Sequence, residues 1–292
     1  MRKILLFTIL IKVNLVISAI DYYVNKTGSD SSDGMSPATA WRTISKVNSV
    51  FSRLQPSDKI LFNRGDSFYG TVLISGSGSS GNYITVGSYG QGASPVITGF
   101  LDISGSWENY SKNVYRKAIK SNSRIRFLTI NGRNYLPGRF PDSGRFLITA
   151  SSTNFIEDNL NLKQDDNFWK GAEVSFRINR WEHKLREVNE YIKSSNRLKY
   201  NSGSAPPIGY GYFLQNHINC LMDNGDWCYS GGYIYLYYSN DPDSLNIKVS
   251  TLDIGVNTNT QSYINIIDLD FSGFNKSGVF INRSQFVNIL NS

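Results

Sequence analysis

Short apolar segments in this sequence recur at a nearly constant spacing of 23 or 24 residues. The recurring pairs are 60–62 with 84–86, 72–74 with 96–98, and 263–266 with 286–289. Short strands at a period of this size are typical of a parallel β-solenoid, in which each coil buries its inward side chains only by stacking on the next. The sequence therefore predicts an all-β protein whose coils present a long, regular outer face.

The repeats are confined to the two ends of the chain. Residues 20–104 are expected to hold an N-terminal cap and the first coils, and residues 247–292 an incomplete set of resumed coils. Residues 105–246 lose the period and are richer in Trp, Arg and Glu, which predicts an inserted β-rich, sandwich-like module; long decorated coils are the alternative. Short strands are expected in this segment at 126–130, 173–178, 210–214 and 233–238, and the charge-rich part at 182–193 fits a short helix or a solvated hairpin.

Residues 1–19 have the pattern of a secretory signal peptide. Arg2 and Lys3 precede a mostly apolar stretch, interrupted by Lys12, that ends in the small residues Ser18 and Ala19. This stretch is shorter than the roughly 20 residues needed to span a bilayer, so cleavage is favoured over an uncleaved anchor. We therefore expect a secreted, periplasmic or cell-surface protein with no stable membrane insertion.

One helix is expected just before the first repeat, opening near Pro37. Its apolar residues fall at helical spacing along one face, namely Trp41, Ile44, Val47 and Phe51. The open end of a solenoid needs such a cover, because unpaired strand edges associate with other chains. At the other end the pattern stops at Ser292 without a second cap, which predicts either further coils or a C-terminal partner that covers the stack.

The distribution of charge argues against a nucleic acid as the partner. The formal charge of +7 includes three basic residues of the leader, and the other basic residues are scattered. A mildly basic surface of this kind suits an acidic partner or is simply a soluble surface.

The two cysteines, Cys220 and Cys228, are eight residues apart. This spacing is compatible with a local disulfide in an exported protein and equally with two free buried thiols. The two histidines, His183 and His217, do not have metal-ligand spacing with them, so no metal site is expected.

Several segments together resemble a known family. They are 22–25, 28–44 and 58–66 near the N-terminus, then Gly138-Arg139-Phe140-Pro141, and then 223–237 with Asp223-Asn224-Gly225-Asp226-Trp227. They are similar to secreted right-handed parallel β-helix proteins of the pectate-lyase-like superfamily, which holds lyases, hydrolases, epimerases and adhesins. The resemblance implies a right-handed parallel β-helix with a polysaccharide as partner. One departure is Asp226, where this group usually has glutamate.

Hydrolysis of a glycosidic bond requires two carboxyl groups, one as acid and one as base or nucleophile. Asp268 and Asp270 flank Leu269 in an expected strand, so both carboxylates should point outward while Ile267, Leu269 and Phe271 point inward. Their backbone separation of about 6.6 Å is compatible with either stereochemical outcome. Asp268 and Asp270 are therefore the predicted catalytic residues, with ordinary solvated aspartates as the alternative.

Sugars bind to proteins through aromatic faces with polar groups at the edge. Trp181, Trp227 and Tyr210 in the expected module are the predicted substrate-binding aromatics, and Arg139 is predicted to hold an acidic sugar. Buried core aromatics are the alternative for the rings, and an ion pair with Asp142 is the alternative for Arg139.

The favoured function is an exported polysaccharide-active enzyme that cleaves glycosidic bonds. Hydrolysis is favoured over lyase chemistry because the expected insert resembles that of β-helix glycosidases. No cofactor is expected, and Ca²⁺ would be needed only by a lyase; the aspartates of the 30–33 loop favour an Asx turn over a Ca²⁺ loop. The alternative is a non-catalytic polysaccharide-binding or adhesin-like β-helix protein, or an inactive truncated relic.

Overall fold

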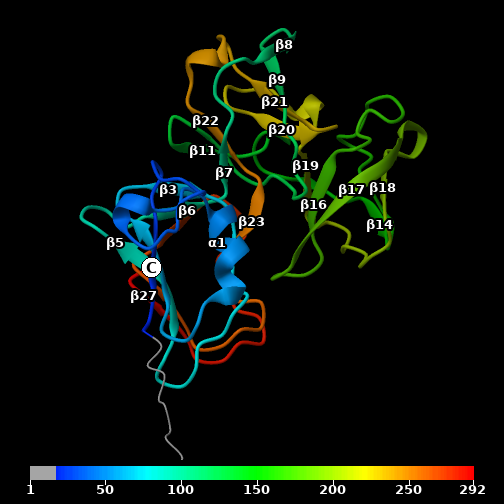
Figure 1. Cartoon of the computed structure of the whole chain (residues 1–292). Coiled ribbons are helices and arrows are strands. Elements are labelled where there is room, and N and C mark those ends of the chain that lie inside the picture. The colour runs from blue at the N-terminus through cyan, green and yellow to red at the C-terminus, as the bar shows by residue number, and fades with distance from the viewer. Residues whose placement is uncertain (1–17) are drawn as a thin grey trace, which may run out of the picture.

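The structure, a computed structural model, describes residues 18–292, so most of the expected signal peptide lies outside the described residues. The described chain is mostly β, and eleven of its strands form three parallel sheets (Figure 1). The first sheet has the order β1 (Asp21–Val24), β2 (Lys59–Asn63), β5 (Ile84–Tyr89), β24 (Ile264–Ile267), β27 (Val287–Leu290). The second is β3 (Ser67–Tyr69), β6 (Val96–Thr98), β25 (Asp270–Ser272), and the third is β4 (Val72–Leu73), β23 (Leu252–Asn257), β26 (Phe274–Phe280).

The chain visits these three sheets in a fixed order. It passes through β2, β3 and β4, then through β5, β6 and β23, then through β24, β25 and β26, before it returns to the first sheet as β27. The second circuit is interrupted, because residues 99–251 lie between β6 and β23. Segments that are far apart in sequence therefore become neighbours within one sheet.

The strand register confirms one of the three sequence repeats. Asn265 lies opposite Asn288, a spacing of 23 residues, and the Asn288 amide donates to Asn265 at 2.9 Å. Segments 60–62 and 84–86 also pair, but Ile60 lies opposite Val86, two residues beyond the repeat. Because strand side chains alternate between faces, this shift of two leaves the same face buried.

The prediction that segments 72–74 and 96–98 are equivalent strands of successive coils is wrong. Val72 pairs with Val256 in the third sheet, whereas Ile97 pairs with Phe68 and Phe271 in the second. The turns between strands differ in length and residues 99–251 interrupt the circuit, so a constant sequence period cannot reach across them.

The three parallel sheets enclose one hydrophobic core. Alternate residues point inward along each strand, and side chains such as Ile60, Ile84, Ile97, Ile266 and Leu269 are fully buried in it. Each circuit supplies only a few of these side chains, so burial depends on stacking between circuits.

The N-terminal helix is shorter than expected. The helix α1 (Ile44–Val50) starts after Thr43, whose hydroxyl accepts from the backbone N–H of Lys46 at 3.1 Å, and short 3₁₀ turns lie on either side as η1 (Pro37–Thr39) and η2 (Phe51–Arg53). The four predicted apolar residues nevertheless share the parallel-sheet core. Asn48 of α1 also bonds the backbone on both sides of Val72, accepting from the Leu73 N–H at 2.9 Å and donating to the Thr71 carbonyl at 2.8 Å. The helix therefore covers the edge strand β4.

The strands between Phe100 and Ser250 pair antiparallel. One four-stranded sheet has the order β11 (Arg133–Tyr135), β10 (Leu128–Ile130), β22 (Ile247–Ser250), β7 (Phe100–Asp102). Another has the order β20 (Trp227–Ser230), β21 (Tyr233–Tyr237), β9 (Val114–Ala118), β8 (Glu108–Ser111). They share a second hydrophobic core. The division at residues 105 and 246 stays a prediction.

An eight-stranded sheet holds the middle of the chain. Its main path is β12 (Arg139–Phe140), β19 (Gly211–Gln215), β16 (Glu173–Arg177), β17 (His183–Ile192), β18 (Arg197–Tyr200), β15 (Phe155–Glu157), β14 (Ala150–Ser152), and β13 (Phe146–Leu147) pairs with β19. The charge-rich segment is therefore mostly strand and not helix. Three 3₁₀ turns follow strands in this half of the chain: η3 (Lys193–Ser195), η4 (Ile218–Cys220) and η5 (Pro242–Ser244).

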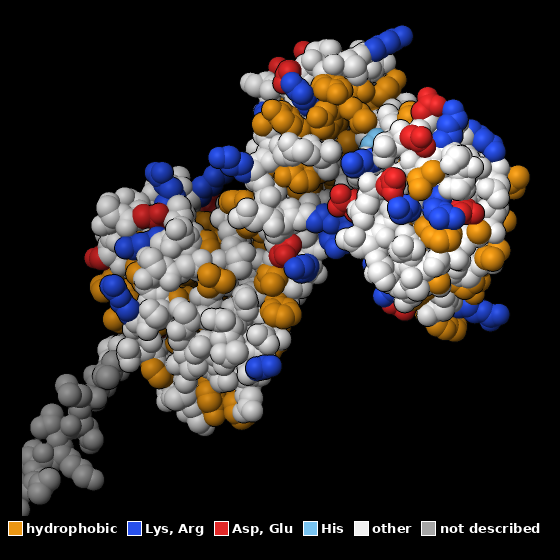
Figure 2. Space-filling model, turned by 90° about the vertical axis from the view of Figure 1, so that its right-hand side faces the viewer, with side chains coloured by type: hydrophobic (Ala, Val, Ile, Leu, Met, Phe, Trp, Pro, Cys, Tyr) orange, Lys and Arg blue, Asp and Glu red, His pale blue; other side chains and the backbone are white. Residues whose placement is uncertain are grey.

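This eight-stranded sheet has its own hydrophobic core, so the described chain contains three main cores. The space-filling view shows three corresponding lobes, with basic and acidic side chains gathered where the upper and right-hand lobes meet (Figure 2). Cys220 and Cys228 are both buried free thiols. No helix within residues 18–292 is long and apolar enough to span a membrane.

Candidate functional site

The two later motifs of the family resemblance meet in the structure. Pro137 forms a parallel bridge with Trp227, and the Gly138 N–H donates to the Trp227 carbonyl at 2.9 Å. This contact brings the segment after β11 against the start of β20, although they are about 90 residues apart in sequence. The turn before β20 also requires glycine at position 225, because its φ is +95° and a Cβ there would lie 2.1 Å from the Tyr135 ring.

A cavity of about 330 Å³ lies on the face of the eight-stranded sheet, and a cavity of about 280 Å³ lies where the two motifs meet. The second cavity contains two carboxylates, Asp142 and Asp226. The rest of its lining combines basic, polar, aromatic and apolar residues, namely Arg133, Asn134, Tyr135, Leu136, Pro137, Arg139, Asn224 and Gly225. Two carboxyl groups in one cavity are what acid–base cleavage of a glycosidic bond needs.

The two carboxylates have different environments. Asp226 is half-buried, and its Oδ2 accepts from the backbone N–H groups of Met222 at 2.9 Å and Asp223 at 2.8 Å. Burial raises the pKa of Asp226, helped by the negative charges of Asp223 and Asp142 and opposed by those two hydrogen bonds. Asp142 is exposed. One carboxyl group is therefore disposed to keep a proton while the other is open to solvent.

Arg139 lines this cavity, as the prediction of a binding role requires. Its guanidinium lies 4.0 Å from the centre of the Phe213 ring, and its Nε donates to the Pro141 carbonyl at 3.0 Å. Burial and the charge of Arg145 lower the pKa of Arg139, while the charge of Asp142 raises it. Arg139 thus experiences the charges of both a carboxylate and a second arginine.

Trp227 does not lie at a binding surface. Its ring is fully buried in the second core, and its Nε1 donates to the Tyr135 carbonyl at 2.8 Å. The structure therefore corrects the prediction that Trp227 contacts substrate. Its role is to hold the strand that carries Tyr135, which lines the cavity.

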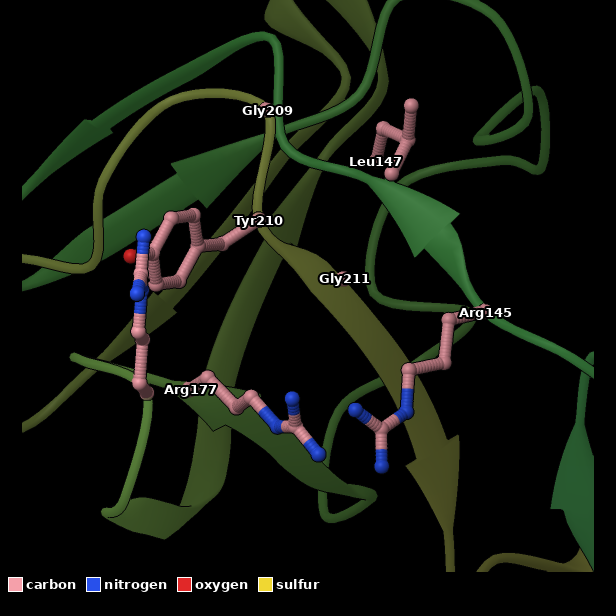
Figure 3. Close-up of a pocket in the computed structure, with 7 residues that line it drawn as sticks. Arg145, Leu147, Arg177, Gly209, Tyr210 and Gly211 are labelled. Atoms are coloured by element: carbon pink, nitrogen blue, oxygen red, sulfur yellow. The ribbon is translucent and has the colours of Figure 1, made fainter.

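Tyr210 lines the other cavity, and Trp181 is the sequence neighbour of a lining arginine. Tyr210 lines it together with Arg145, Leu147, Arg177, Arg180, Gly209 and Gly211 (Figure 3). Trp181 follows Arg180 in the turn between β16 and β17, and 89% of its surface is exposed. Tyr210 and Arg139 therefore line two different cavities, whereas Trp181 and Trp227 line neither of them.

Asp268 and Asp270 do not share one strand. Asp268 lies at the corner between β24 and β25 with a φ of +56°, and Asp270 begins β25. The Asp268 carboxylate forms an ion pair with Arg64 at 2.9 Å and accepts from Asn291 at 3.2 Å. Leu269 between them is buried as expected, whereas Ile267 and Phe271 are only partly buried. A catalytic role for the two aspartates stays a prediction.

Three carboxylates were missed as catalytic candidates from sequence, and one of them, Asp226, was noted only as a departure from the family motif. Asp142 directly follows the Gly138–Pro141 motif, so the motif itself was a signal for it. Glu173, at the start of β16, forms an ion pair with Arg124 and accepts from Gln215 at 3.0 Å, and burial raises its pKa. Nothing in the local sequence distinguishes Glu173 from a surface residue.

Within residues 18–292 no group of three or more His, Cys, Asp or Glu side chains is placed to hold a metal ion. In the 30–33 loop, Asp30 accepts from the backbone of Arg42 and Thr43, and Asp33 accepts from Met35 and Thr39. The Asp33 contact with the Met35 N–H has the spacing of an Asx turn, whereas Asp30 joins the loop to the segment before α1.

Comparison with known proteins connects the chain with carbohydrate-active enzymes. No protein-family model matches the sequence. Over 103 residues, 33% of the chain, it is 32% identical to a lacto-N-biosidase of Bifidobacterium longum, of which it spans 6%. A solved glycoside hydrolase matches 88% of this chain with a TM-score of 0.69 at 14% identity, and the match covers 51% of that protein. A GH136 lacto-N-biosidase from Eubacterium ramulus is 30% identical over 33% of the chain, with a TM-score of 0.25 and 16% of that protein covered.

The chain therefore spans about half the length of the solved glycoside hydrolase and a small part of the curated lacto-N-biosidase. The first likeness establishes a shared fold. The second is a local similarity in sequence to a carbohydrate-active protein.

Proposed function

We propose that this chain is part of an exported, carbohydrate-active enzyme that hydrolyses glycosidic bonds. The observation that carries the proposal is the cavity in which Asp142 and Asp226 lie together with Arg133, Arg139 and Tyr135. The similarity to glycoside hydrolases supports it. Residues 1–19 support export, since their pattern is that of a signal peptide.

The proposal includes the architecture. The fixed order of visits to three parallel sheets supports a right-handed parallel β-helix capped by α1, with residues 105–246 as an inserted module. The proposed catalytic cavity then belongs to the module and not to the outer face of the coils.

In the proposed mechanism Asp226 is the general acid. A raised pKa lets it keep a proton and donate that proton to the leaving oxygen of the glycosidic bond. The Asp226 Oδ2 is occupied by two backbone N–H groups, which leaves Oδ1 to carry the proton. Asp142 would act as the base that activates water or as the nucleophile.

The test is the release of reducing ends from a panel of neutral and acidic polysaccharides. We expect Asp226→Asn and Asp142→Asn each to lower the rate by about 10²–10⁴-fold. Asp223→Asn is the comparison variant from the same turn: Asp223 does not line the cavity, so activity should persist. The wild-type rate should fall as pH rises through the pKa of Asp226, which lies above 3.8. In Asp223→Asn this fall in rate should only move to lower pH, because the Asp223 charge helps raise the pKa of Asp226.

Parallel variants decide between the two pairs of carboxylates. If Asp268→Asn and Asp270→Asn abolish activity while Asp142→Asn and Asp226→Asn do not, the proposed cavity is not the active site. New absorbance from an unsaturated uronate would identify a lyase instead.

A non-catalytic polysaccharide-binding protein is the second candidate. The exposed indole of Trp181 favours it, since 89% of that side chain is open to a ligand. Binding without release of reducing ends or unsaturated products would select this function.

A further inference from the structure

The cavity of about 330 Å³, here called the arginine cavity, lies on the outer face of the eight-stranded sheet. Along β19, Tyr212 and Leu214 point into the core, so Gly211, Phe213 and Gln215 face outward. The arginines that line the cavity come from three places, namely Arg145 just before β13, Arg177 at the end of β16, and Arg180 in the following turn. The close-up shows Arg145 and Arg177 pointing toward each other (Figure 3).

The cavity has an excess of positive charge. Its seven lining residues include three arginines and no carboxylate. Within residues 18–292, none of these arginines forms an ion pair, whereas Arg64, Arg116, Arg124 and Arg197 each pair with a carboxylate. Guanidinium groups that converge without a counter-charge repel one another until an anion lies between them.

The positive charge of these arginines also affects the pKa of the neighbouring His183. Desolvation lowers its pKa, and the charges of Arg145 and Arg177 lower it further. The neutral ring accepts from the Arg177 Nε at 2.9 Å, which holds this guanidinium in place. The nitrogen atoms at the end of Arg177 remain directed to the cavity, in the fork that matches a planar carboxylate.

Arg145 is held by the strand beneath it. A Cβ at Gly211 would lie 2.8 Å from the Arg145 Cδ, so the absence of a side chain at position 211 allows the Arg145 stem to lie across β19. Its guanidinium lies 6.0 Å from the Phe213 ring, whose centre is also close to Arg139. Both arginines of the facing pair are therefore supported before any ligand arrives.

The rim of the cavity suits the ring of a sugar. Tyr210 lines it, Leu147 is 57% exposed, and Trp181 next to Arg180 is 89% exposed. Exposed aromatic and aliphatic side chains beside charged donors provide an apolar contact together with polar recognition. Gln215 pairs with Arg139 and lies four residues from Gly211, or about 13 Å along β19. One short oligosaccharide can therefore extend from this cavity to Arg139 of the proposed catalytic cavity.

We propose that Arg145, Arg177 and Arg180 bind the carboxylate or sulfate group of an acidic carbohydrate, with Trp181 and Tyr210 against its ring. This inference rests on the proposed carbohydrate function and names its substrate class. It also assigns a binding role to a face of the module that the two catalytic candidates do not use.

The test is binding measured by calorimetry with three probes of similar length: oligogalacturonate, a sulfated galactan oligosaccharide, and a neutral xylo-oligosaccharide. We expect the wild type to bind at least one acidic probe, and the double variant Arg145→Gln/Arg177→Gln to bind it about tenfold or more weakly. Arg53→Gln/Arg283→Gln is the control for the loss of two charges, because both are exposed arginines that do not line this cavity, and it should leave affinity unchanged. Whichever acidic probe binds identifies the anion as carboxylate or sulfate.

Three results would overturn the inference: no binding of either acidic probe, equal affinity for the neutral probe, or an unaltered affinity in the double variant. The outcome is separate from that of the catalytic proposal. Binding of an acidic probe without its cleavage supports the arginine binding site and contradicts the proposed hydrolysis of that substrate. Asp226-dependent cleavage of a neutral substrate, without binding of an acidic probe, supports the proposed hydrolase and contradicts the arginine binding site.

Discussion

The buried pair formed by Asp158 and Tyr212 should stabilise the sheet that carries the arginine cavity. Both side chains are fully buried, and the Tyr212 hydroxyl donates to the Asp158 Oδ2 at 2.8 Å. Asp158 also accepts from the backbone N–H groups of Leu160 at 2.9 Å and Asn161 at 3.0 Å, and from the Asn161 side chain at 2.8 Å. One carboxylate thus fixes both the loop after β15 and strand β19.

The cost of removing this carboxylate can be worked from its four partners. In Asp158→Ala the buried Tyr212 hydroxyl loses its acceptor, which costs about 1–3 kcal/mol, and the loop loses charge-assisted bonds that water replaces in part. We expect a total loss of about 3–4 kcal/mol, against about 1.5 kcal/mol for Tyr212→Phe, which leaves Asp158 its other three bonds. The double variant should be less unstable than the sum of the two by about 1–2 kcal/mol, because both single variants lose the same bond.

Native-state hydrogen exchange can measure this loss locally, which suits a chain with several cores. In Asp158→Ala the amides of β19 should exchange about 100-fold faster, as a loss near 3 kcal/mol requires. The amides of β24, which belong to the parallel-sheet core, are the internal control and should not change. A loss below about 1 kcal/mol in β19, or additive effects in the double variant, would refute the reasoning.

Three further predictions follow from the same region. Gly211→Ala should weaken binding of the acidic probe several-fold, measured by calorimetry, since the new Cβ would displace the Arg145 stem. The pKa of His183, measured by NMR titration, should lie below 6.5. The folded state then binds this proton less tightly than the unfolded chain, so the stability of the protein falls as pH drops below 6.5. A pKa at or above 6.5 would contradict the effect of the neighbouring arginines. Burial raises the pKa of Cys220 to about 12 and raises that of Cys228, so neither thiol should react with a disulfide reagent at pH 8 until the protein is unfolded.

Much of the local structure could be predicted because it depends on neighbours in the sequence. The alternation of apolar residues placed strands such as β16, β19 and β21 within a residue or two of their ends. The spacing of 23 residues placed Asn265 opposite Asn288 because no insertion separates those two strands. The partner of Val72, in contrast, is Val256, and no local pattern spans the residues between them.

The candidate sites show the same limit. A tryptophan beside a glycine-containing turn is typical of a sugar-binding site. Trp227 is nevertheless buried, because the two antiparallel sheets of its lobe pack around it. Asp268 was expected in a strand, but the chain turns a corner there and directs its carboxylate to Arg64. Asp142 became a candidate only when the fold placed it in one cavity with Asp226.

The sequence by itself determined that this chain forms short strands with alternating buried residues, an N-terminal helix, and a middle segment of different character. These properties follow from side-chain periodicity and turn chemistry, which act over a few residues. The tertiary structure alone decided which charges lie together: two carboxylates at one cavity and three arginines at another. The reason is that side chains from separate strands and turns meet only through strand pairing and core packing, and these contacts depend on the whole chain.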